Sequence, residues 1–303
     1  REAAARRACA SLGLNECATY SFIDARAAVL FGGGGEETRL ENPISSEMSH
    51  MRPSLLPGLM QAASRNQARG MGDFGLFEVG AAFHGGEPED SGTFVAGIRV
   101  GATGPRDVHG ARRAVDVFDA KADMEAVLAA IGAPSRVQIR RGADGAWHPG
   151  RHGIMGLGPK VSLGTFGELH PRILEALELR GPAVGFVIDL AAVPFPKAKG
   201  TGRPALELAD LQAVERDFAF VLDADVPAAD VVAAAAGADK ALIEDVRVFD
   251  EFVGGPLGEG RKSLAVTVRM QPRDKTLTDA EIEAVGKAVV AKVAAATGGS
   301  LRG

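Results

Sequence analysis

The chain has 303 residues, which is more than one typical domain and suggests two. Hydrophobic residues make up 46% of it, enough for two cores, and its net charge of −5 excludes a polycation that binds nucleic acid through bulk charge. No apolar run approaches a membrane helix and no signal peptide is present, so we expect a cytoplasmic protein without membrane contact. The two cysteines, Cys9 and Cys17, are expected to be small buried thiols.

Residues 1–195 mix predicted helices and strands. Periodicity predicts helices over 2–13, 25–30, 57–66, 122–131 and 172–179, and strands over 73–79, 94–100, 137–141, 154–157, 161–166 and 185–190. Four glycines at 32–35 lack the Lys and Ser/Thr of a phosphate-binding loop and predict a flexible turn.

A Pro-, Lys- and Gly-rich stretch divides the chain. Three prolines, two lysines and two glycines lie between residues 194 and 204. We therefore expect one domain over 1–195, a linker over 196–210 and a second domain over 211–303.

The second domain is predicted to be ferredoxin-like. Strands are indicated at 218–222, 243–253, 262–271 and 300–302, and helices at 228–236 and after Thr278, which forms a capping box with Glu281. The order βαββαβ is the split βαβ arrangement, whose two helices cover one face of the sheet. Strict alternation places Arg247, Phe249 and Arg269 on the open face, although a slip of one residue would exchange Arg247 for Val248.

The open face has two interpretations. Arginines and an aromatic ring on a flat sheet can hold phosphates and stack unpaired bases. The alternative is a solvated face with one exposed Phe. From residue 211 onward, 11 Lys/Arg stand against 15 Asp/Glu, a net of −4, so any RNA contact must come from a local patch.

Four blocks of this domain carry a family resemblance. They are Ala-Val-Glu-Arg-Asp-Phe-Ala at 213–219, Val-Arg-Val-Phe-Asp at 246–250, Gly-Arg-Lys-Ser-Leu-Ala at 260–265 and Lys-Thr-Leu-Thr-Asp at 275–279. In order and spacing they resemble the ferredoxin-fold anticodon-binding domain that ends the β subunit of bacterial phenylalanyl-tRNA synthetase.

The first domain resembles another part of the same subunit. The blocks at 42–59, 74–80 and 115–121 are similar to its central catalytic-like domain. The resemblance covers essentially the whole chain and implies an α+β fold: a class II synthetase-like antiparallel sheet with helices, followed by the βαββαβ domain. The chain starts at Arg1 without Met, so we expect a fragment of a longer subunit.

The resemblance implies a subunit of phenylalanine–tRNA ligase that charges tRNA(Phe) with phenylalanine. This chain would be a non-catalytic scaffold for the α subunit in a heterotetramer and would bind the anticodon region of tRNA(Phe). ATP and Mg²⁺ would be used by the holoenzyme and not held by this chain, which could form a homodimer in isolation. The alternatives are a purely structural scaffold with negligible RNA binding and a self-contained enzyme.

The residues disfavour catalysis by this chain. A class II active site clamps ATP phosphates with arginines on two strands. The matching strands, residues 75–79 and 164–170, contain no Arg. His148 and His152 are four residues apart, but Pro149-Gly150 between them prevents a helical metal pair. We therefore expect no catalytic and no metal residue, and Arg151 is left open between anion binding and a structural role.

Two sets of site residues follow. For tRNA we expect Arg247, Phe249 and Arg269 on the open face, Arg261 and Lys262 at its strand entry, and Arg216 and Lys275 beside it. For the α subunit, the family's four-helix interface implies Arg6, Leu12, Asn42, Pro43, Leu55 and Leu59. The alternative for Leu55 and Leu59 is that they fill this chain's own core.

Overall fold

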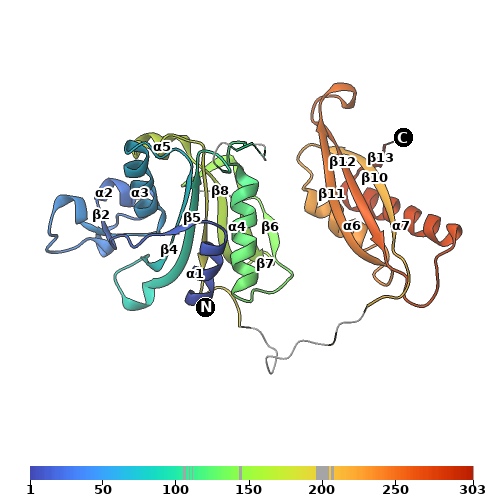
Figure 1. Ribbon diagram of the computed structural model, residues 1–303, viewed down its shortest axis with the longest axis horizontal. Coiled ribbons are helices and arrows are strands. Elements are labelled where there is room, and N and C mark those ends of the chain that lie inside the picture. The colour runs from blue at the N-terminus through green and yellow to red at the C-terminus, as the bar shows by residue number, and fades with distance from the viewer. Residues whose placement is uncertain are drawn as a thin grey trace. The chain divides into compact units, whose positions relative to one another are not determined.

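The computed structural model describes residues 1–104, 107–108, 110, 112–142, 145–195, 205 and 208–302 (Figure 1). The chain forms two compact units, residues 1–199 and 200–303. Most of the predicted linker, 196–204 and 206–207, lies outside the described residues. No helix in the described ranges is long and apolar enough to cross a bilayer.

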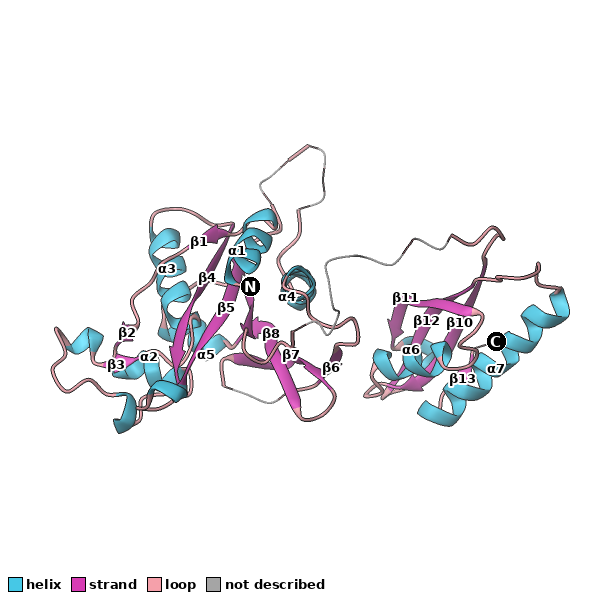
Figure 2. Cartoon of the chain, turned by 90° about the horizontal axis from the view of Figure 1, so that it is seen from below, coloured by secondary structure: helices cyan, strands magenta, loops and turns pink. Residues whose placement is uncertain are grey.

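A seven-stranded sheet forms the centre of the N-terminal unit (Figure 2). Its order is β1 (Asn15–Glu16), β4 (Phe74–Phe83), β5 (Ser91–Val100), β9 (Ala183–Asp189), β8 (Val161–Leu169), β7 (Trp147–Leu157) and β6 (Gln138–Arg140). The pairing is antiparallel except between β1 and β4. A small second sheet pairs β2 (Phe22–Ile23) with β3 (His50–Met51). The expected antiparallel sheet with helices is confirmed.

Alternating side chains direct the two faces of this sheet into two cores. On β9, Val184, Phe186 and Ile188 join the helices α1 (Glu2–Ser11) and α4 (Val117–Ala130). Ala183 lies on the other face, with α3 (Leu56–Ala68) and α5 (Pro171–Ala176). The short helix α2 (Ala25–Leu30) packs beside β3.

Several boundaries differ from the predicted ones. The helix predicted from residue 122 begins at Val117, because Asp116 and Asp119 form a capping box five residues earlier. β7 extends back to Trp147 through a stretch that was not predicted as strand, because its pairing with β8 tolerates an irregular register.

The C-terminal unit has the predicted ferredoxin-like fold. Along the chain come β10 (Val214–Asp223), α6 (Ala228–Ala236), β11 (Ile243–Val253), β12 (Arg261–Met270), α7 (Asp279–Thr297) and β13 (Ser300–Leu301). The sheet order is β11-β12-β10-β13, with every pair antiparallel. Both helices pack on one face around Phe220, Val266 and Val289. The predicted capping box of α7 is present, and Gly298 ends the helix with φ +69°.

Candidate nucleic-acid and subunit interfaces

The register of β12 defines the open face of the C-terminal sheet. Leu264, Val266, Val268 and Met270 enter the core, so the residues between them point away from the helices. These open-face residues are Arg261, Ser263, Ala265, Thr267 and Arg269, and their direct partners on β10 are Asp223, Val221, Ala219, Asp217 and Glu215. The centre of the face is therefore lined by small side chains, and acidic residues lie along β10.

Two bulges in β11 change which of its residues share this face. The register shifts between Ile243 and Asp245 and between Val248 and Asp250. Arg247 lies opposite Thr267, as predicted for the open face. Phe249 falls within the second bulge and has no direct partner, and it is 56% exposed.

Phe252 is an open-face residue that the sequence reasoning missed. Beyond the bulge it lies opposite Ser263, and it is 42% exposed. Strict alternation would have placed it with Val246 and Val248 on the helix side. The signal that could have found it is the neighbouring carboxylates Asp250-Glu251, because two successive polar residues break a period of two.

The other predicted open-face cations are already engaged by carboxylates. Arg269 lies 3.0 Å from Glu244 and 3.4 Å from Glu215, and hydrogen bonding to Glu244 raises the pKa of its guanidinium. Arg261 lies 2.8 Å from Asp223. Arg247, by contrast, forms no ion pair within the described part of the chain.

Three predicted phosphate contacts lie off the open face. Lys262 pairs in register with Leu222 on the helix side, is 7% exposed and bonds Glu251 at 3.2 Å. Arg216 lies opposite Val268, also on the helix side. Neighbouring strand residues point to opposite faces, so Arg261 and Lys262 could not share one. Lys275 follows β12 and bonds Glu281 at 2.6 Å, which lowers the pKa of Glu281 to about 2.

Two residues predicted as subunit contacts are buried inside this chain. Leu55 and Leu59 have no exposed surface and pack in the core beneath α3. The alternative that they fill this chain's own core therefore holds. Asn42 and Pro43 are exposed and precede Ile44, which is 88% exposed.

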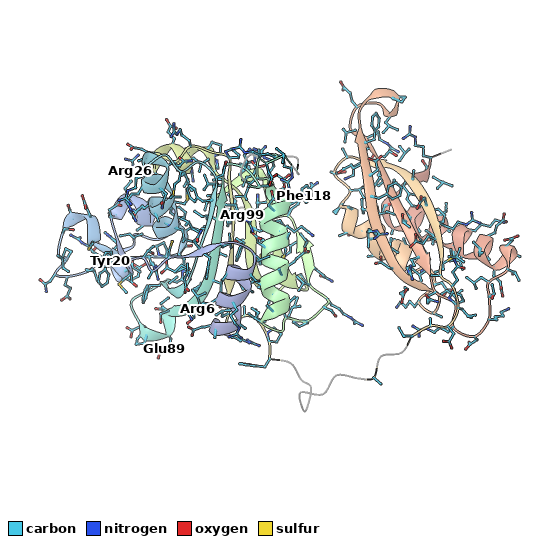
Figure 3. The ribbon with its side chains drawn as sticks, viewed as in Figure 1. Arg6, Tyr20, Arg26, Glu89, Arg99 and Phe118 are labelled. Carbon is cyan, nitrogen blue, oxygen red and sulfur yellow. The ribbon has the colours of Figure 1, made fainter. Side chains whose placement is uncertain are left out.

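The other two predicted contacts lie on helix α1 and at its C-cap, Leu12, and both have partners within the chain. Arg6, labelled in Figure 3, lies on α1. It pairs with Glu16 at 2.9 Å and donates to the Val79 carbonyl. Leu12 packs against the core, and its carbonyl accepts from Arg99. The helix that packs beside α1 is α4. A groove of about 430 Å³ between them is lined by Ala4, Arg7, Ala8, Ser11, Leu12, Ala126 and Ala130.

A buried polar cluster on β4 was not predicted. Arg52 donates to Glu78 at 2.8 Å and to Thr19 at 2.9 Å, and Thr19 donates to the second oxygen of Glu78 at 2.6 Å. The Arg52 and Glu78 side chains are 3% and 6% exposed. The cluster ties the segments before β2 and after β3 to the main sheet.

The strands that would carry a class II active site hold no phosphate clamp. β4 and β8 are fully described and contain no Arg. Arg151 pairs with Glu168 of β8 at 2.6 Å. His152 bonds the His148 carbonyl at 2.7 Å. No cluster of three or more metal-ligating side chains occurs among the residues that the structure describes.

Sequence comparison defines the class and then the family. Residues 209–302 match the model described as "Ferredoxin-fold anticodon binding domain", so the C-terminal unit belongs to that class of domain. Residues 1–190 match "Phenylalanyl tRNA synthetase beta chain CLM domain". The chain belongs to the phenylalanyl-tRNA synthetase beta chain family.

Two similar proteins are named phenylalanine–tRNA ligase beta subunit. That of Ruegeria pomeroyi is 67% identical over 99% of this chain, and that of Cereibacter sphaeroides is 62% identical over 100% of it. This chain spans 38% of the length of each. Among solved structures, the pyrrolysyl-tRNA synthetase of Desulfitobacterium hafniense is 16% identical with a TM-score of 0.46, and the match covers 62% of this chain and 65% of that one.

Proposed function

We propose that this chain is the C-terminal portion of a phenylalanine–tRNA ligase β subunit and that its open sheet face binds the anticodon region of tRNA(Phe). The observation that carries the proposal is that β11 bears two exposed aromatic rings, Phe249 and Phe252, together with Arg247, which has no ion pair among the described residues. Exposed aromatic rings on a sheet stack unpaired bases, and a free guanidinium can bind a phosphate.

The charge of the face determines how binding would work. Asp217, Asp223, Asp245 and Asp250 share it with the paired arginines, so long-range attraction of RNA is weak. Stacking would supply most of the affinity, and few phosphates would be neutralised. We therefore expect a shallow dependence of affinity on salt, equivalent to one to a few phosphate contacts.

The test is a titration of the chain with tRNA(Phe) at two salt concentrations, in which fluorescence anisotropy measures the binding. Phe252→Ala or Phe249→Ala should weaken binding by about 1–3 kcal/mol, the value of one base stacked on an aromatic ring. Arg247→Ala should reduce the salt slope by about one phosphate. Phe118→Ala is the matched control, because Phe118 is a 70% exposed aromatic ring on α4 (Figure 3). Unchanged affinity in all three variants would contradict RNA binding by this face.

We infer a second role in assembly with the catalytic α subunit, as a non-catalytic part of a cytoplasmic heterotetramer that uses ATP and Mg²⁺. The absence of arginine from β4 and β8 supports a non-catalytic role. The α1–α4 groove supports a helical interface, because alanines allow helices of a partner to approach closely. The exposed loop with Asn42, Pro43 and Ile44 is a second candidate contact.

The assembly proposal is tested by one pair of variants on helices. Ala130→Arg places a long charged side chain in the groove and should weaken association with the α subunit at least ten-fold. Ala10→Arg makes the same change on exposed α1 surface outside the groove residues and should leave association unchanged. Analytical ultracentrifugation of the mixed subunits measures both. Equal affinities of the two variants for the α subunit would contradict an interface at the groove.

A purely structural scaffold is the second candidate function. The pairing of Arg269 and Arg261 with carboxylates favours it, because those cations are not free for phosphates. It predicts α-subunit binding together with no saturable tRNA binding in the same titration.

A further inference from the structure

A positively charged segment of the N-terminal unit has no role in the proposed function. Residues 126–167 contain five Lys or Arg and one acidic residue, a net charge of +4, whereas the whole chain carries −5. The acidic residue is Asp144, which lies outside the described residues and can neutralise one of these cations. Arg151 is paired with Glu168, so the excess positive charge lies elsewhere in the segment.

Three exposed cations of this segment have no carboxylate partner. Arg140 is on β6, Arg136 precedes that strand, and Lys160 lies in the turn between β7 and β8. None of the three forms an ion pair or a side-chain hydrogen bond with the residues that the structure describes. On the open face of the C-terminal sheet, in contrast, Arg261 and Arg269 are engaged by carboxylates. The N-terminal unit therefore offers free cations that the C-terminal face largely lacks.

The pairing register brings two of these cations to one end of the sheet edge. β6 is the last strand of the seven-stranded sheet (Figure 2), and its three residues are exposed. Gln138 of β6 lies opposite Gly156 of β7, which lies opposite Ser162 of β8. Arg136 precedes Gln138 by two residues, and Lys160 precedes Ser162 by two. Because β6 and β8 run in the same direction, both cations lie beyond the same end of the sheet.

Arg140 and Gln138 point to the same side of the sheet. Ile139 lies between them and opposite Met155, which is buried in the core with α4, so its two neighbours point away from that helix. Their own neighbours across β7 and β8 carry no charge; these are Ile154, Thr165, Gly156 and Ser162. His152 adds a positive charge, because both its ring nitrogens contact backbone carbonyls and must therefore donate.

We propose that this edge surface binds the sugar–phosphate backbone of double-stranded RNA; its members are Arg136, Gln138, Arg140, Lys160 and Ser162. Guanidinium and ammonium groups bind phosphates, and amide and hydroxyl groups hydrogen-bond phosphate or ribose oxygens. Duplex RNA is recognised mainly through such contacts, whereas unpaired bases need aromatic rings to stack on. The edge surface has no aromatic member, so its chemistry favours a duplex. This inference does not depend on RNA binding by the open face of the C-terminal sheet.

The test is a titration of the 303-residue chain with a blunt-ended RNA duplex, in which fluorescence anisotropy measures the binding. Three phosphate contacts predict that affinity falls about forty-fold as salt rises from about 50 to about 200 mM. A blunt duplex has no unpaired base, so Phe252→Ala should leave this affinity unchanged, which separates the edge surface from the open face. Absence of saturable duplex binding overturns the proposal. Equally tight binding of poly-glutamate also overturns it, because an acidic protein would then fit the surface as well as RNA.

Two double variants locate the binding. Arg136→Gln with Arg140→Gln removes two cations of the edge surface and should weaken duplex binding at least ten-fold at the lower salt concentration. The remaining salt dependence should be that of about one phosphate, a fall in affinity of about three- to four-fold over the same range. Arg26→Gln with Arg69→Gln removes the same charge from exposed arginines on α2 and at the C-cap of α3, and should leave binding unchanged; Arg26 is labelled in Figure 3. Equal effects of the two double variants overturn the proposal.

Discussion

The pKa of the Cys9 thiol is determined by the surroundings of this side chain. It has no exposed surface and lies in the core shared by α1 and α4. Burial, reinforced by the charge of Asp123, raises the pKa of its thiol to about 12. The thiolate is the reactive form of cysteine, so this residue is expected to stay inert at neutral pH.

The stability of the N-terminal unit should therefore depend on pH through Cys9. Below the ordinary thiol pKa of 9.0 the thiol keeps its proton in both states and contributes no pH dependence. Above it, the unfolded chain loses the proton and the folded chain retains it, so stability falls with rising pH by up to about 1.4 kcal/mol per unit. Urea unfolding of wild type and Cys9→Ala between pH 7 and 10.5 measures this. If the difference between their free energies of unfolding stays constant over that range, Cys9 does not contribute to the pH dependence.

At the scale of elements, the helix and strand patterns predicted most of the fold. The capping box at Thr278 and Glu281 marks the start of α7, because the signal lies within four residues of the chain. Arg247 was placed on the correct face for the same local reason. Phe252 was not placed on the open face, because the bulge that reverses the alternation before it depends on how β11 pairs with β12.

The partner of α1 could not be predicted from local signals either. An apolar stripe shows that a helix is buried on one side but does not identify what covers it. Both α3 and α4 have such stripes, and they lie in different cores. The Arg52–Glu78 pair was missed for a similar reason, since 26 residues separate its members in the sequence.

Thr278→Ala should destabilise the C-terminal unit by about 1 kcal/mol, because the first turn of α7 loses its side-chain acceptor. Thr276→Ala is a matched control, since Thr276 is exposed and precedes the helix. It should change the free energy of unfolding by less than about 0.5 kcal/mol. Equal effects of the two substitutions, measured by urea unfolding, would show that the cap contributes nothing.

At the scale of the whole molecule, the separate cores of the two units imply two separate unfolding events. The clusters of the N-terminal unit share no residue with the cluster around Phe220 and Val266. Each unit buries its own apolar surface, which is the main source of folding stability. A substitution in one unit should therefore leave the other unchanged.

Arg52→Met tests this independence. It leaves the buried Glu78 carboxylate without its partner and should cost the N-terminal unit about 3–5 kcal/mol. Trp147 fluorescence follows that unit, and the methyl NMR signals of Val266 follow the other. Arg39→Met, which breaks an exposed pair with Glu36, should cost less than about 1 kcal/mol. A shift of both transitions in Arg52→Met would show that the units unfold together.

The position of β11 at the edge of its sheet has a consequence for solubility. An edge strand has unpaired backbone groups that a strand from another molecule can extend, and exposed aromatic rings make such pairing more favourable. Its two bulges interrupt the ladder, and the carboxylates of Asp245 and Asp250 repel an identical strand, whereas Glu244 and Glu251 are paired with Arg269 and Lys262. The same irregularities that display Phe249 and Phe252 thereby protect concentrated protein from forming continuous β-sheet aggregates.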